Sequence, residues 1–512
     1  MLAKVLSSAV LGVDAYLVEV EVDIGMGLPS FNTVGLPDTS VKESRDRVKA
    51  AIKNSGFEFP SRRITVNLAP ADIKKEGACF DLPTACGILA AIGLIRPGRL
   101  KDHVILGELS LDGGIRSIRG ALPMAVSAAH AGLVGMILPA ENAPEAAVVE
   151  GIQIFGVETL PQVVEFLNGA QEVPPTRIDL QEVFAQHAEY SVDLTDVKGQ
   201  AHAKRALEVA AAGGHNILLI GPPGSGKTML AKRLPTILPD LILEEAIEVT
   251  KLHSICGLLP GRASLIATRP FRSPHHTISD AGLIGGGGIP RPGEVSLAHH
   301  GVLFLDEFPE FKRSVLEVLR QPLEDGVVTI SRAVTSVTFP ARFMLAAAMN
   351  PCPCGFFTDP QRECTCSPPQ IERYRSRISG PLLDRIDLHV DVPSLRYREL
   401  AAETQGESSE KVRERVKRAR ALQHDRFRRT RTFCNAQMGA KQLRRACSIG
   451  PDGQRLLETA IERLGLSARA HDRILKVART IADLDGAEHI GRPHLAEALA
   501  YRALNDRIAM AA

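Results

Sequence analysis

A glycine-rich loop and the helix that follows it, in the middle of the chain, could bind the phosphates of a nucleotide. The segment NILLIGPPGSGKTML (216–230) reads as an apolar strand, the pattern G-x-x-x-x-G-K-T and a helix. Glycines let backbone N–H groups curve around phosphate oxygens, and the following helix points its positive end at them. Lys227 would neutralise phosphate oxygens, and Thr228 would offer its hydroxyl to Mg²⁺. The predicted phosphate loop is Gly221, Pro222, Pro223, Gly224, Ser225, Gly226, Lys227 and Thr228.

Acidic and amide side chains follow two further apolar runs of strand length. GVLFLDE (301–307) ends in Asp306 and Glu307, and FMLAAAMN (343–350) ends in Asn350. Because the carboxyl ends of parallel strands meet at one edge of a sheet, we expect these side chains beside the phosphate loop. Asp306 would hold Mg²⁺, Glu307 would polarise the attacking water as general base, and Asn350 would contact the γ-phosphate or the water. Without the loop, both runs would be ordinary buried strands ending in polar turns.

Four of the nine cysteines lie close together directly after Asn350. Cys352, Cys354, Cys364 and Cys366 have the spacing C-x-C, nine residues, C-x-C. Thiolates bind Zn²⁺ as a tetrahedron at about 2.3 Å, and a reducing compartment disfavours disulfides. Four sulfur ligands leave no open position for water, so the spacing predicts a structural zinc site rather than a catalytic one. A cluster of reactive thiols is the alternative.

The composition restricts the class of protein. With 512 residues, 45% hydrophobic and 23% charged, the chain has the make-up of a soluble protein of several domains. The net charge of +2 means that any affinity for nucleic acid has to come from local basic patches or from assembly. The first residues lack a signal-cleavage site, and no apolar stretch is long and charge-free enough to span a membrane. We therefore expect a cytoplasmic protein.

The periodicity of the sequence divides the chain into four regions. Residues 1–168 alternate strands and helices, with a capping box predicted at 40–43 and a buried helix at the apolar run LPTACGILAAIGLI. Residues 169–189 are a predicted linker, because residues 169–180 are turn-rich. Residues 190–397 again alternate strands and helices, whereas 398–512 have helical periodicity and no clear strand. We expect an α/β multidomain protein with a helical carboxyl-terminal domain.

Residues 269–307 carry a family resemblance. Their sequence, RPFRSPHHTISDAGLIGGGGIPRPGEVSLAHHGVLFLDE, resembles the region before the second acidic motif in magnesium-chelatase-type AAA+ ATPases, and specifically in the bacterial ComM/YifB family. The similarity extends over essentially the whole chain. It implies an AAA+ P-loop core over 190–397, a helical lid over 398–512, ATP and Mg²⁺ as cofactors, and assembly into a homo-hexameric ring.

The resemblance also assigns residues outside the phosphate loop. Gln200, in the motif DVKGQ, would line the adenine pocket. Asn350 would take the sensor-1 role, and Arg469, on a lid helix, would face the γ-phosphate as sensor 2. Arg385, in SGPLLDRIDLHV, would be the arginine finger that reaches the ATP of the neighbouring subunit. An arginine supplied by a neighbour offsets charge that develops in the transition state.

Two insertions contain the candidate DNA contacts. EDGVVTISRAVTSVTFPAR alternates like two strands around Ser331–Arg332–Ala333 and resembles the hairpin that projects into the pore of related helicases. Arg272 and the glycine run 285–288 belong to a segment that resembles another pore-facing insert. Arg332 and Arg272 are therefore candidate phosphate contacts, with a solvated hairpin tip as the alternative for Arg332. The adjacent histidines in SPHHT are a weak signal for a metal.

The amino-terminal region resembles the proteolytic domain of Lon, in residues 73–83 and 107–142. This resemblance implies a fold of the ribosomal S5 domain 2 type. Lon pairs a serine nucleophile with a lysine that activates it. In this chain Cys79 occupies the serine position, and RGALPMAVSAA (119–129), where the lysine should lie, has none. We therefore predict a Lon-protease-like domain without protease chemistry, serving in assembly or DNA contact.

The leading hypothesis implied by the resemblance is an ATP-driven ring motor on single-stranded or branched DNA. Its helicase or branch-migration activity would promote the integration of incoming single strands in natural transformation, with other recombination proteins as further partners. The main alternative is a remodelling ATPase or chaperone of magnesium-chelatase type that does not act on DNA. Metal insertion into a porphyrin is disfavoured by the Lon-like region, and proteolysis is disfavoured by the missing lysine.

Overall fold

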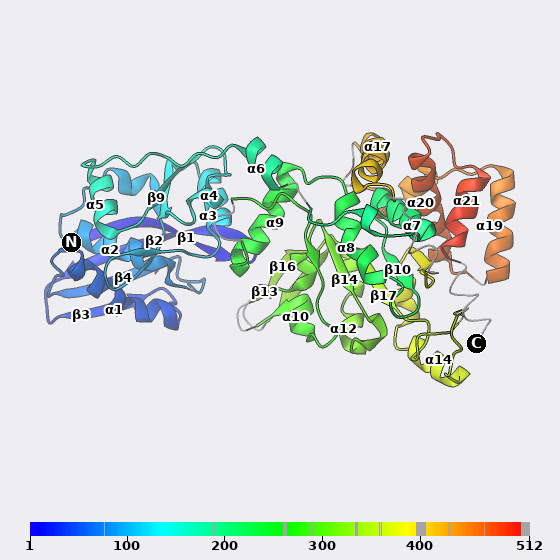
Figure 1. Ribbon diagram of the computed structural model, residues 1–512. Coiled ribbons are helices and arrows are strands. Elements are labelled where there is room, and N and C mark those ends of the chain that lie inside the picture. The colour runs from blue at the N-terminus through cyan, green and yellow to red at the C-terminus, as the bar shows by residue number, and fades with distance from the viewer. Residues whose placement is uncertain are drawn as a thin grey trace. The chain divides into compact units, whose positions relative to one another are not determined.

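The computed structural model shows two compact units (Figure 1). The first comprises Met1–His187, Leu243–Ala267 and Ala333–Thr338, and the second comprises Ala188–Ile242, Thr268–Arg332 and Phe339–Ala512. The structure describes the whole chain except residues 76, 188–189, 260–263, 288–289, 333–335, 358, 360, 396–405, 429, 431, 465 and 503–512. Ala333 of the predicted hairpin tip and Gly288 of the glycine run therefore lie outside the described residues. Within the described residues, no helix combines the length and apolar character that crossing a membrane requires.

A seven-stranded mixed sheet forms the core of the first unit, in the order β3-β4-β2-β1-β5-β8-β9. The run YLVEVEVDI alternates in and out of the core, which leaves Val18, Val20 and Val22 fully buried. The strands of the sheet are β1 Leu2–Leu11, β2 Asp14–Gly25, β3 Ser30–Val34, β4 Arg63–Ala69, β5 His103–Ile105, β8 Gly135–Pro139 and β9 Gln153–Val157. A separate short pair consists of β6 Glu108–Leu109 and β7 Ile115–Arg116.

The first helix begins earlier than the predicted capping box at 40–43, so that expectation was wrong. Helix α1 spans Thr39–Asn54, and the Asp38 carboxylate caps it by accepting a hydrogen bond of 2.8 Å from the Val41 backbone N–H. Aspartate caps a helix as well as serine does, and its charge also suits the positive helix end. The buried apolar helix is confirmed as α2, Asp81–Ala91.

Helix α9, Leu243–Cys256, belongs to the first unit although it comes from the 190–397 region of the sequence. It packs against α3, Ala121–His130. The buried Ser254 hydroxyl of α9 donates a hydrogen bond to the buried Glu145 carboxylate. The first unit is therefore completed by a helix from a distant part of the chain. Its other helices are α4 Ala143–Ala146, α5 Leu160–Asn168 and α6 Leu180–His187.

Five parallel strands form the sheet of the second unit, in the order β11-β14-β17-β10-β18. Buried apolar side chains fill β10, β14 and β17, as expected for a parallel sheet covered on both faces. The predicted buried strands before the loop, before Asp306 and before Asn350 are thus confirmed. The strands are β10 Ile217–Ile220, β11 Phe271–Arg272, β14 Val302–Leu305, β17 Met344–Met349 and β18 Leu388–Asp391, and the long helices beside them are α7 Ala201–Gly213 and α8 Lys227–Ile237.

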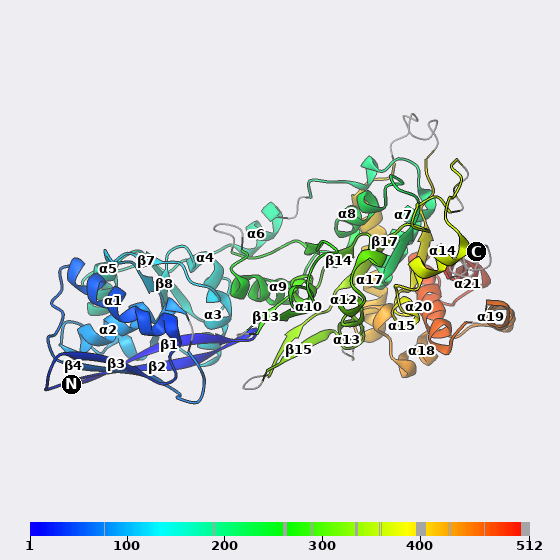
Figure 2. The same cartoon turned by 90° about the horizontal axis from the view of Figure 1, so that it is seen from below.

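Two small hairpins and several short helices surround this sheet. Strands β12 Gly285–Gly286 and β13 Arg291–Pro292 form one pair, and β15 Val327–Ser331 and β16 Ser336–Pro340 form the other. The second pair is the hairpin that the alternating pattern predicts, and Figure 2 shows β15 leading away from the five-stranded sheet. The short helices are α10 Asp280–Ile284, α11 Glu294–Leu297, α12 Arg313–Glu317, α13 Arg320–Asp325, α14 Pro368–Arg375 and α15 Gly380–Leu383.

Helices make up the carboxyl-terminal region, as predicted. They are α17 Ser409–Phe427, α18 Ala440–Ala446, α19 Pro451–Leu464, α20 Ala468–Leu484 and α21 Arg492–Ala500, and α20 packs against α21 (Figure 1). A buried polar network fastens α20 to the sheet. His215 lies 2.8 Å from the Thr480 hydroxyl and 3.2 Å from the Asp387 carboxylate, and Asp387 also pairs with Arg473. The chain is therefore a mixed α/β protein with a parallel sheet and a helical carboxyl-terminal region.

Candidate nucleotide site

The phosphate loop begins directly at the carboxyl end of β10. A Cβ atom at Gly221 would lie 2.1 Å from the Val392 carbonyl oxygen, so only glycine fits there. Gly224 and Gly226 have φ angles of +75° and +94°, a backbone conformation that glycine adopts without steric cost. Gly226 also precedes the first residue of α8, Lys227. The loop therefore presents backbone N–H groups and a helix amino terminus to the same space, as phosphate binding requires.

Lys227 and Asn350 meet inside the loop. The Lys227 ammonium donates hydrogen bonds of 2.7 Å and 2.9 Å to the carbonyls of Gly221 and Pro222, and one of 3.2 Å to the Asn350 side-chain oxygen. Lys227 is only 8% exposed. Burial lowers its pKa to about 8, although Asp306 acts in the opposite direction. A buried cation held by neutral carbonyls favours an incoming anion, which fits a phosphate group.

Thr228 and Asp306 form the pair expected for a magnesium site. The Thr228 hydroxyl donates a hydrogen bond of 2.6 Å to one oxygen of the Asp306 carboxylate. The other carboxylate oxygen accepts a hydrogen bond of 2.9 Å from the Glu307 backbone N–H. Hydroxyl and carboxylate oxygens are the ligands that Mg²⁺ prefers, so the two side chains fit the ion.

Glu307 contacts a histidine that the sequence analysis did not assign to the site. Glu307 adopts a left-handed backbone conformation with φ of +51° directly after Asp306. Its side chain lies 3.1 Å from the His276 Nδ1 atom. The only sequence signal for this contact is the histidine pair that follows β11, which we weighed only as a weak metal signal. The structure thus brings Glu307 to the phosphate-loop edge of the sheet and gives it a partner.

Gln200 lies between the phosphate loop and the chain after β18. Its side-chain amide donates a hydrogen bond of 2.7 Å to the Pro393 carbonyl and a longer one of 3.4 Å to the Ser225 carbonyl. Its backbone has a φ of +53°. Gln200 therefore borders the loop, on the side formed by the turn before α7.

Arg385 and Arg469 lie together, away from the phosphate loop of their own chain. The buried Arg385 guanidinium donates to the Pro381 carbonyl at 2.6 Å and pairs with Glu324. The same carboxylate lies 3.8 Å from the exposed Arg469 guanidinium. The Arg385 carbonyl accepts from the side chain of Asn216, which precedes β10, whereas the phosphate loop follows β10. Both arginines therefore lie toward the amino-terminal edge of the sheet, and Glu324 is a shared partner that sequence reasoning missed.

Comparison with known proteins places the chain in a family. The model of magnesium chelatase subunit ChlI matches residues 193–400, a second ChlI model matches 20–142, and the ChlI carboxyl-terminal model matches 406–502. Competence protein ComM of Haemophilus influenzae is 48% identical over 507 residues, which cover 98% of each chain. The chain belongs to the ComM/YifB family of magnesium-chelatase-like proteins. YifB of Salmonella typhimurium is 46% identical over 506 residues, 98% of this chain and 97% of that one.

Membership in the ComM/YifB family, which is of the AAA+ magnesium-chelatase type, implies ATPase activity with ATP and Mg²⁺ as cofactors. A more distant match covers only part of the chain. Lon protease 2 of Bacillus subtilis is 32% identical over 155 residues, which are 28% of this chain and 27% of that protein. Part of this chain therefore resembles a Lon protease in sequence.

The four clustered cysteines of this ComM/YifB chain converge in the structure. The Cys352 sulfur lies 3.3 Å from that of Cys354 and 3.7 Å from that of Cys364, and all four sulfurs lie within 4.8 Å of one another. Sulfurs on a tetrahedral zinc ion at 2.3 Å would be about 3.8 Å apart. Backbone N–H groups of Cys354 and Gly355 donate to the sulfurs of Cys366 and Cys352, at 3.3 Å and 3.2 Å. The cluster could bind zinc, since its donor set and spacing fit the ion.

The cysteine cluster adjoins the phosphate loop. A Cβ atom at Gly355, whose φ is +89°, would lie 2.5 Å from the Pro223 side chain. The Arg375 guanidinium of α14 donates to the Pro351 carbonyl at 3.0 Å. The segment between Asn350 and α14 is therefore packed against the loop that would hold the phosphates.

The two candidate DNA contacts have different surroundings. Arg272 forms a bidentate ion pair with Glu294, at 2.6 Å and 2.7 Å, and is half-buried. A Cβ atom at Gly286 of β12 would lie 3.4 Å from a terminal nitrogen of Arg332, so the guanidinium of Arg332 lies against that hairpin. The structure therefore brings Arg332 to the glycine run and holds Arg272 at the base of the same insert.

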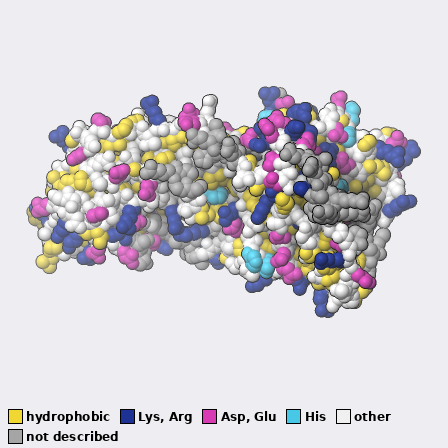
Figure 3. Space-filling view, viewed as in Figure 1, with side chains coloured by type: hydrophobic (Ala, Val, Ile, Leu, Met, Phe, Trp, Pro, Cys, Tyr) yellow, Lys and Arg dark blue, Asp and Glu magenta, His cyan; other side chains and the backbone are white. Residues whose placement is uncertain are grey.

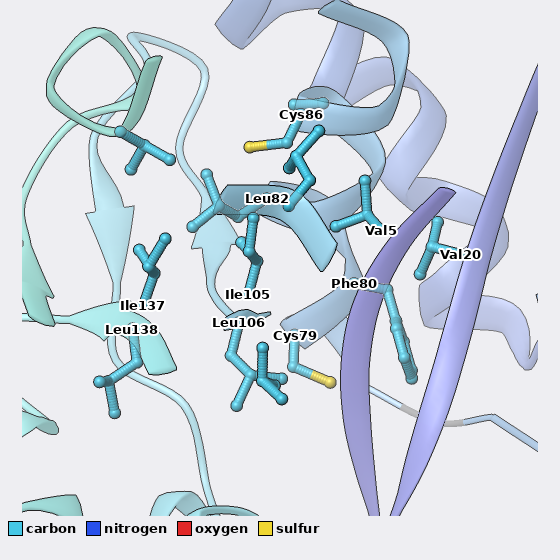
Figure 4. Packing of buried hydrophobic residues seen from close by; sticks show 14 of the residues in the cluster. Val5, Val20, Cys79, Phe80, Leu82, Cys86, Ile105, Leu106, Ile137 and Leu138 are labelled. Carbon is cyan, nitrogen blue, oxygen red and sulfur yellow. The ribbon is translucent and has the colours of Figure 1, made fainter. Parts of the chain in front are cut away.

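Cys79 in the Lon-like region is enclosed by the core of the first unit. Its side chain lies near Leu106 and Phe80 (Figure 4). Burial raises the pKa of its thiol to about 12. Because the thiolate is the nucleophile and the thiol is not, this environment disfavours a nucleophilic role of Cys79 at neutral pH.

Proposed function

We propose that this protein is an ATP-driven ring motor that moves DNA strands by helicase or branch-migration action. The observation that carries the proposal is the convergence of Lys227 with Asn350 and of Thr228 with Asp306 at one edge of a parallel sheet. One relative that matches over nearly the full length is named a competence protein, which supports a role in natural transformation. In this role the motor would promote the integration of an incoming single strand into resident DNA.

The residues of the chain suggest how hydrolysis would proceed. Lys227 would exchange the two loop carbonyls for phosphate oxygens when ATP enters. Thr228 and Asp306 would hold Mg²⁺, which neutralises charge on the phosphates when bound. Glu307 would accept a proton from the attacking water, and Asn350 would orient that water or the γ-phosphate.

A ring of subunits would complete each site. Arg385 and Arg469 lie at the edge of the sheet opposite their own phosphate loop, which supports their action on the ATP of a neighbouring subunit. Glu324 would hold the two guanidinium groups side by side for this task. We propose that the ring is a homo-hexamer. In this ring Arg469 would face the γ-phosphate of the ATP that a neighbouring subunit binds.

DNA contact would depend on local groups rather than on a broad charged surface. On the face shown in Figure 3, the described Lys and Arg side chains alternate with Asp and Glu. Arg332, on the hairpin of β15 and β16, is the proposed phosphate contact, with Arg272 supporting the neighbouring insert. Single-stranded or branched DNA is the proposed substrate, and other recombination proteins are proposed partners.

The cysteine cluster would serve the motor as a structural zinc site. Its position between Asn350 and α14 supports a role in holding the strand end against the phosphate loop. The amino-terminal region, with an S5 domain 2-type fold proposed over 1–168, would act in assembly or DNA contact rather than as a protease. The same proposal divides the rest of the chain into a linker at 169–189, an AAA+ core at 190–397 and a lid at 398–512. It also places the protein in the cytoplasm.

The decisive experiment follows branch migration of a synthetic four-way DNA junction by wild-type protein, Lys227→Ala and Glu307→Gln. We expect wild type with ATP and Mg²⁺ to convert the junction and both variants to fail. Glu307→Gln should still bind ATP, since the lysine and the loop are intact. If ATP is hydrolysed but DNA neither binds nor stimulates hydrolysis, a remodelling ATPase or chaperone of magnesium-chelatase type replaces the motor.

A further inference from the structure

Phe433 places an exposed aromatic ring on a rigid part of the carboxyl-terminal region. The side chain is 49% exposed, and among the Phe and Tyr side chains that the structure describes it is the only exposed one. Its backbone N–H donates to the Gln437 side-chain oxygen at 2.9 Å, and the backbone of the buried Asn435 is held by Gln423 at 2.9 Å. A single exposed apolar side chain is common on proteins, so the surroundings of the ring decide what it can do.

A cation covers part of the Phe433 ring. The Arg342 guanidinium lies 5.7 Å from the ring centroid, within the range of a cation–π contact. Arg342 precedes β17 by two residues, and its own backbone N–H is fixed by donating to the His299 ring at 2.9 Å. Its side chain is exposed and pairs with no carboxylate of the described residues. The ring is therefore held beside a positive group that is still open to an anion.

Further cations lie on the neighbouring helix α18. Three exposed cations share one side of this helix, at the spacing i, i+3 and i+4: Lys441, Arg444 and Arg445. The Gln442 side-chain amide ties the helix to the loop before Phe433, since it donates to the Thr432 hydroxyl at 2.9 Å. The exposed ring and the cations of α18 thus belong to one fastened surface.

The cations of α18 differ from those of α17 in their pairing. Arg426 of α17 pairs with Asp483, and the Lys417 ammonium of α17 lies 2.7 Å from the Asp240 carboxylate. The three cations of α18 form no ion pair within the part of the chain that the structure describes. Unpaired cations gathered in one place attract a polyanion. The surface therefore offers an aromatic face for a base and positive groups for phosphates.

We infer that Phe433 is a stacking platform for a base of single-stranded DNA, and that Arg342 and the three cations of α18 contact the phosphates beside that base. The inference rests on the proposed function and deepens it, because it adds a DNA site in the carboxyl-terminal region to the proposed contact at Arg332. Stacking on an aromatic ring tolerates any sequence, since every base has a π face. Bases in a duplex are already stacked on one another, so the platform selects the single strand.

The first test uses the fact that the chain contains no tryptophan. In full-length Phe433→Trp the indole is the sole tryptophan, so its fluorescence reports directly on stacking at this position. We expect a short oligo(dT) to quench this fluorescence until the site is saturated. A blunt duplex of the same length should leave it unchanged.

The second test measures the Kd of labelled oligo(dT) by fluorescence anisotropy. Phe433→Leu keeps an apolar side chain without a ring and should raise Kd about tenfold, whereas Phe433→Tyr should bind like wild type. Arg445→Ala should raise Kd and reduce the slope of log Kd against log salt concentration by about one. The matched control is Lys417→Ala, which removes a cation that Asp240 already neutralises and should change neither quantity.

The alternative is that Phe433 contacts a neighbouring subunit, so sedimentation velocity follows the assembly of each variant. If Phe433→Leu loses assembly while oligo(dT) leaves the fluorescence of Phe433→Trp unchanged, the surface is a subunit contact and the inference is overturned. Wild type that binds oligo(dT) beside an unquenched Phe433→Trp overturns the platform and leaves the motor standing. Wild type that binds no DNA overturns both. If Phe433→Leu does not fold, the quenching of Phe433→Trp and the salt slope of Arg445→Ala decide.

Discussion

At the scale of single residues, the phosphate loop depends on steric fit as much as on charge. Gly221 and Gly224 are both glycines of the same motif, yet the structure gives them different reasons to be glycine. Gly221 approaches the Val392 carbonyl too closely for any side chain, whereas Gly224 has open space and a φ of +75°. The motif pattern alone does not separate these two requirements.

Substitution of the two glycines by alanine should therefore have unequal effects. Gly221→Ala should lower the free energy of unfolding by about 3 kcal/mol or more, because its methyl group forces β10 and the chain after β18 apart. Gly224→Ala should cost about 1 kcal/mol, the strain of a left-handed alanine. Thermal unfolding of both variants checks this order, and equal losses would contradict the described packing at Val392.

The thiol of Cys79 should be unreactive in the folded protein. Burial raises its pKa to about 12, so less than about one molecule in a thousand carries a thiolate at pH 8. We expect iodoacetamide to modify Cys79 only after denaturation, as followed by peptide mass spectrometry. Rapid modification at pH 8, or casein degradation that Cys79→Ser abolishes, would reinstate a nucleophile in the Lon-like region.

At the scale of elements, polar groups fix where the segments of the second unit end. Asp387, just before β18, pairs with Arg473 of α20 and contacts His215 at the end of α7. Three elements from distant parts of the sequence thus share one buried carboxylate. The proposed zinc cluster has the same role for the segment between β17 and α14, with sulfur in place of oxygen.

The Asp387 network should make stability depend on acid pH. Arg473 and His215 hold the pKa of the buried carboxyl below its usual range although burial acts in the opposite direction. A depressed pKa contributes stability that is full above the unfolded-state pKa of about 4 and is lost as the pH falls below it. Asp387→Asn should lower the free energy of unfolding by about 3 kcal/mol at pH 7. Below about pH 4, its melting temperature should fall less steeply with pH than that of wild type. If the melting temperatures of wild type and variant fell in parallel as the pH is lowered, this expectation would be wrong.

Loss of one cluster cysteine should release zinc and disturb the phosphate loop. Cys364→Ser should lower the zinc content of protein purified under reducing conditions, and its melting temperature should fall because the segment beside Pro223 loosens. ATP hydrolysis should weaken as a consequence. Cys256→Ser, outside the cluster, is the control and should keep its zinc. Wild type with no zinc would show that the sulfurs serve another purpose.

The sequence predicted those elements whose signals are local. The strands β10, β14 and β17 and the glycine loop follow from short runs, and so do the acidic and amide residues at the strand ends. The start of α1 was missed because Asp38 caps the helix in place of the expected serine. The contacts of Glu307 with His276 and of Arg385 with Glu324 join residues 31 and 61 positions apart, and no periodicity encodes such pairs.

At the scale of the whole molecule, the first unit is not a continuous piece of chain. Helix α9 supplies part of its packing and the Ser254 partner of Glu145, although it lies more than fifty residues beyond the predicted linker. Burial raises the pKa of Glu145, so this carboxyl depends on its hydrogen bonds for a stable ionised form. The first unit thus includes a segment that comes from the 190–397 region of the sequence.

A fragment of residues 1–187 should consequently be less stable than the same fragment joined to residues 243–267 through a flexible linker. Without α9, the face of α3 that it covers is exposed, and the Glu145 carboxylate keeps the Leu122 and Asn142 donors but loses the Ser254 hydroxyl. We expect the joined fragment to melt at a temperature several degrees higher and to aggregate less, as followed by circular dichroism and light scattering. Equal melting temperatures would show that α9 is dispensable to the unit.

The detour of the chain through α9 also gives the molecule a mechanical property. The backbone leaves the second unit after Ile242 and returns to it at Thr268, and the strand β11 and His276 follow directly. Tension along the polypeptide between these points is carried by covalent bonds, so it needs no complementary surface to be transmitted. In the proposed motor, a movement of the second unit would therefore pass to the first unit through the chain itself, at Ile242 and Thr268.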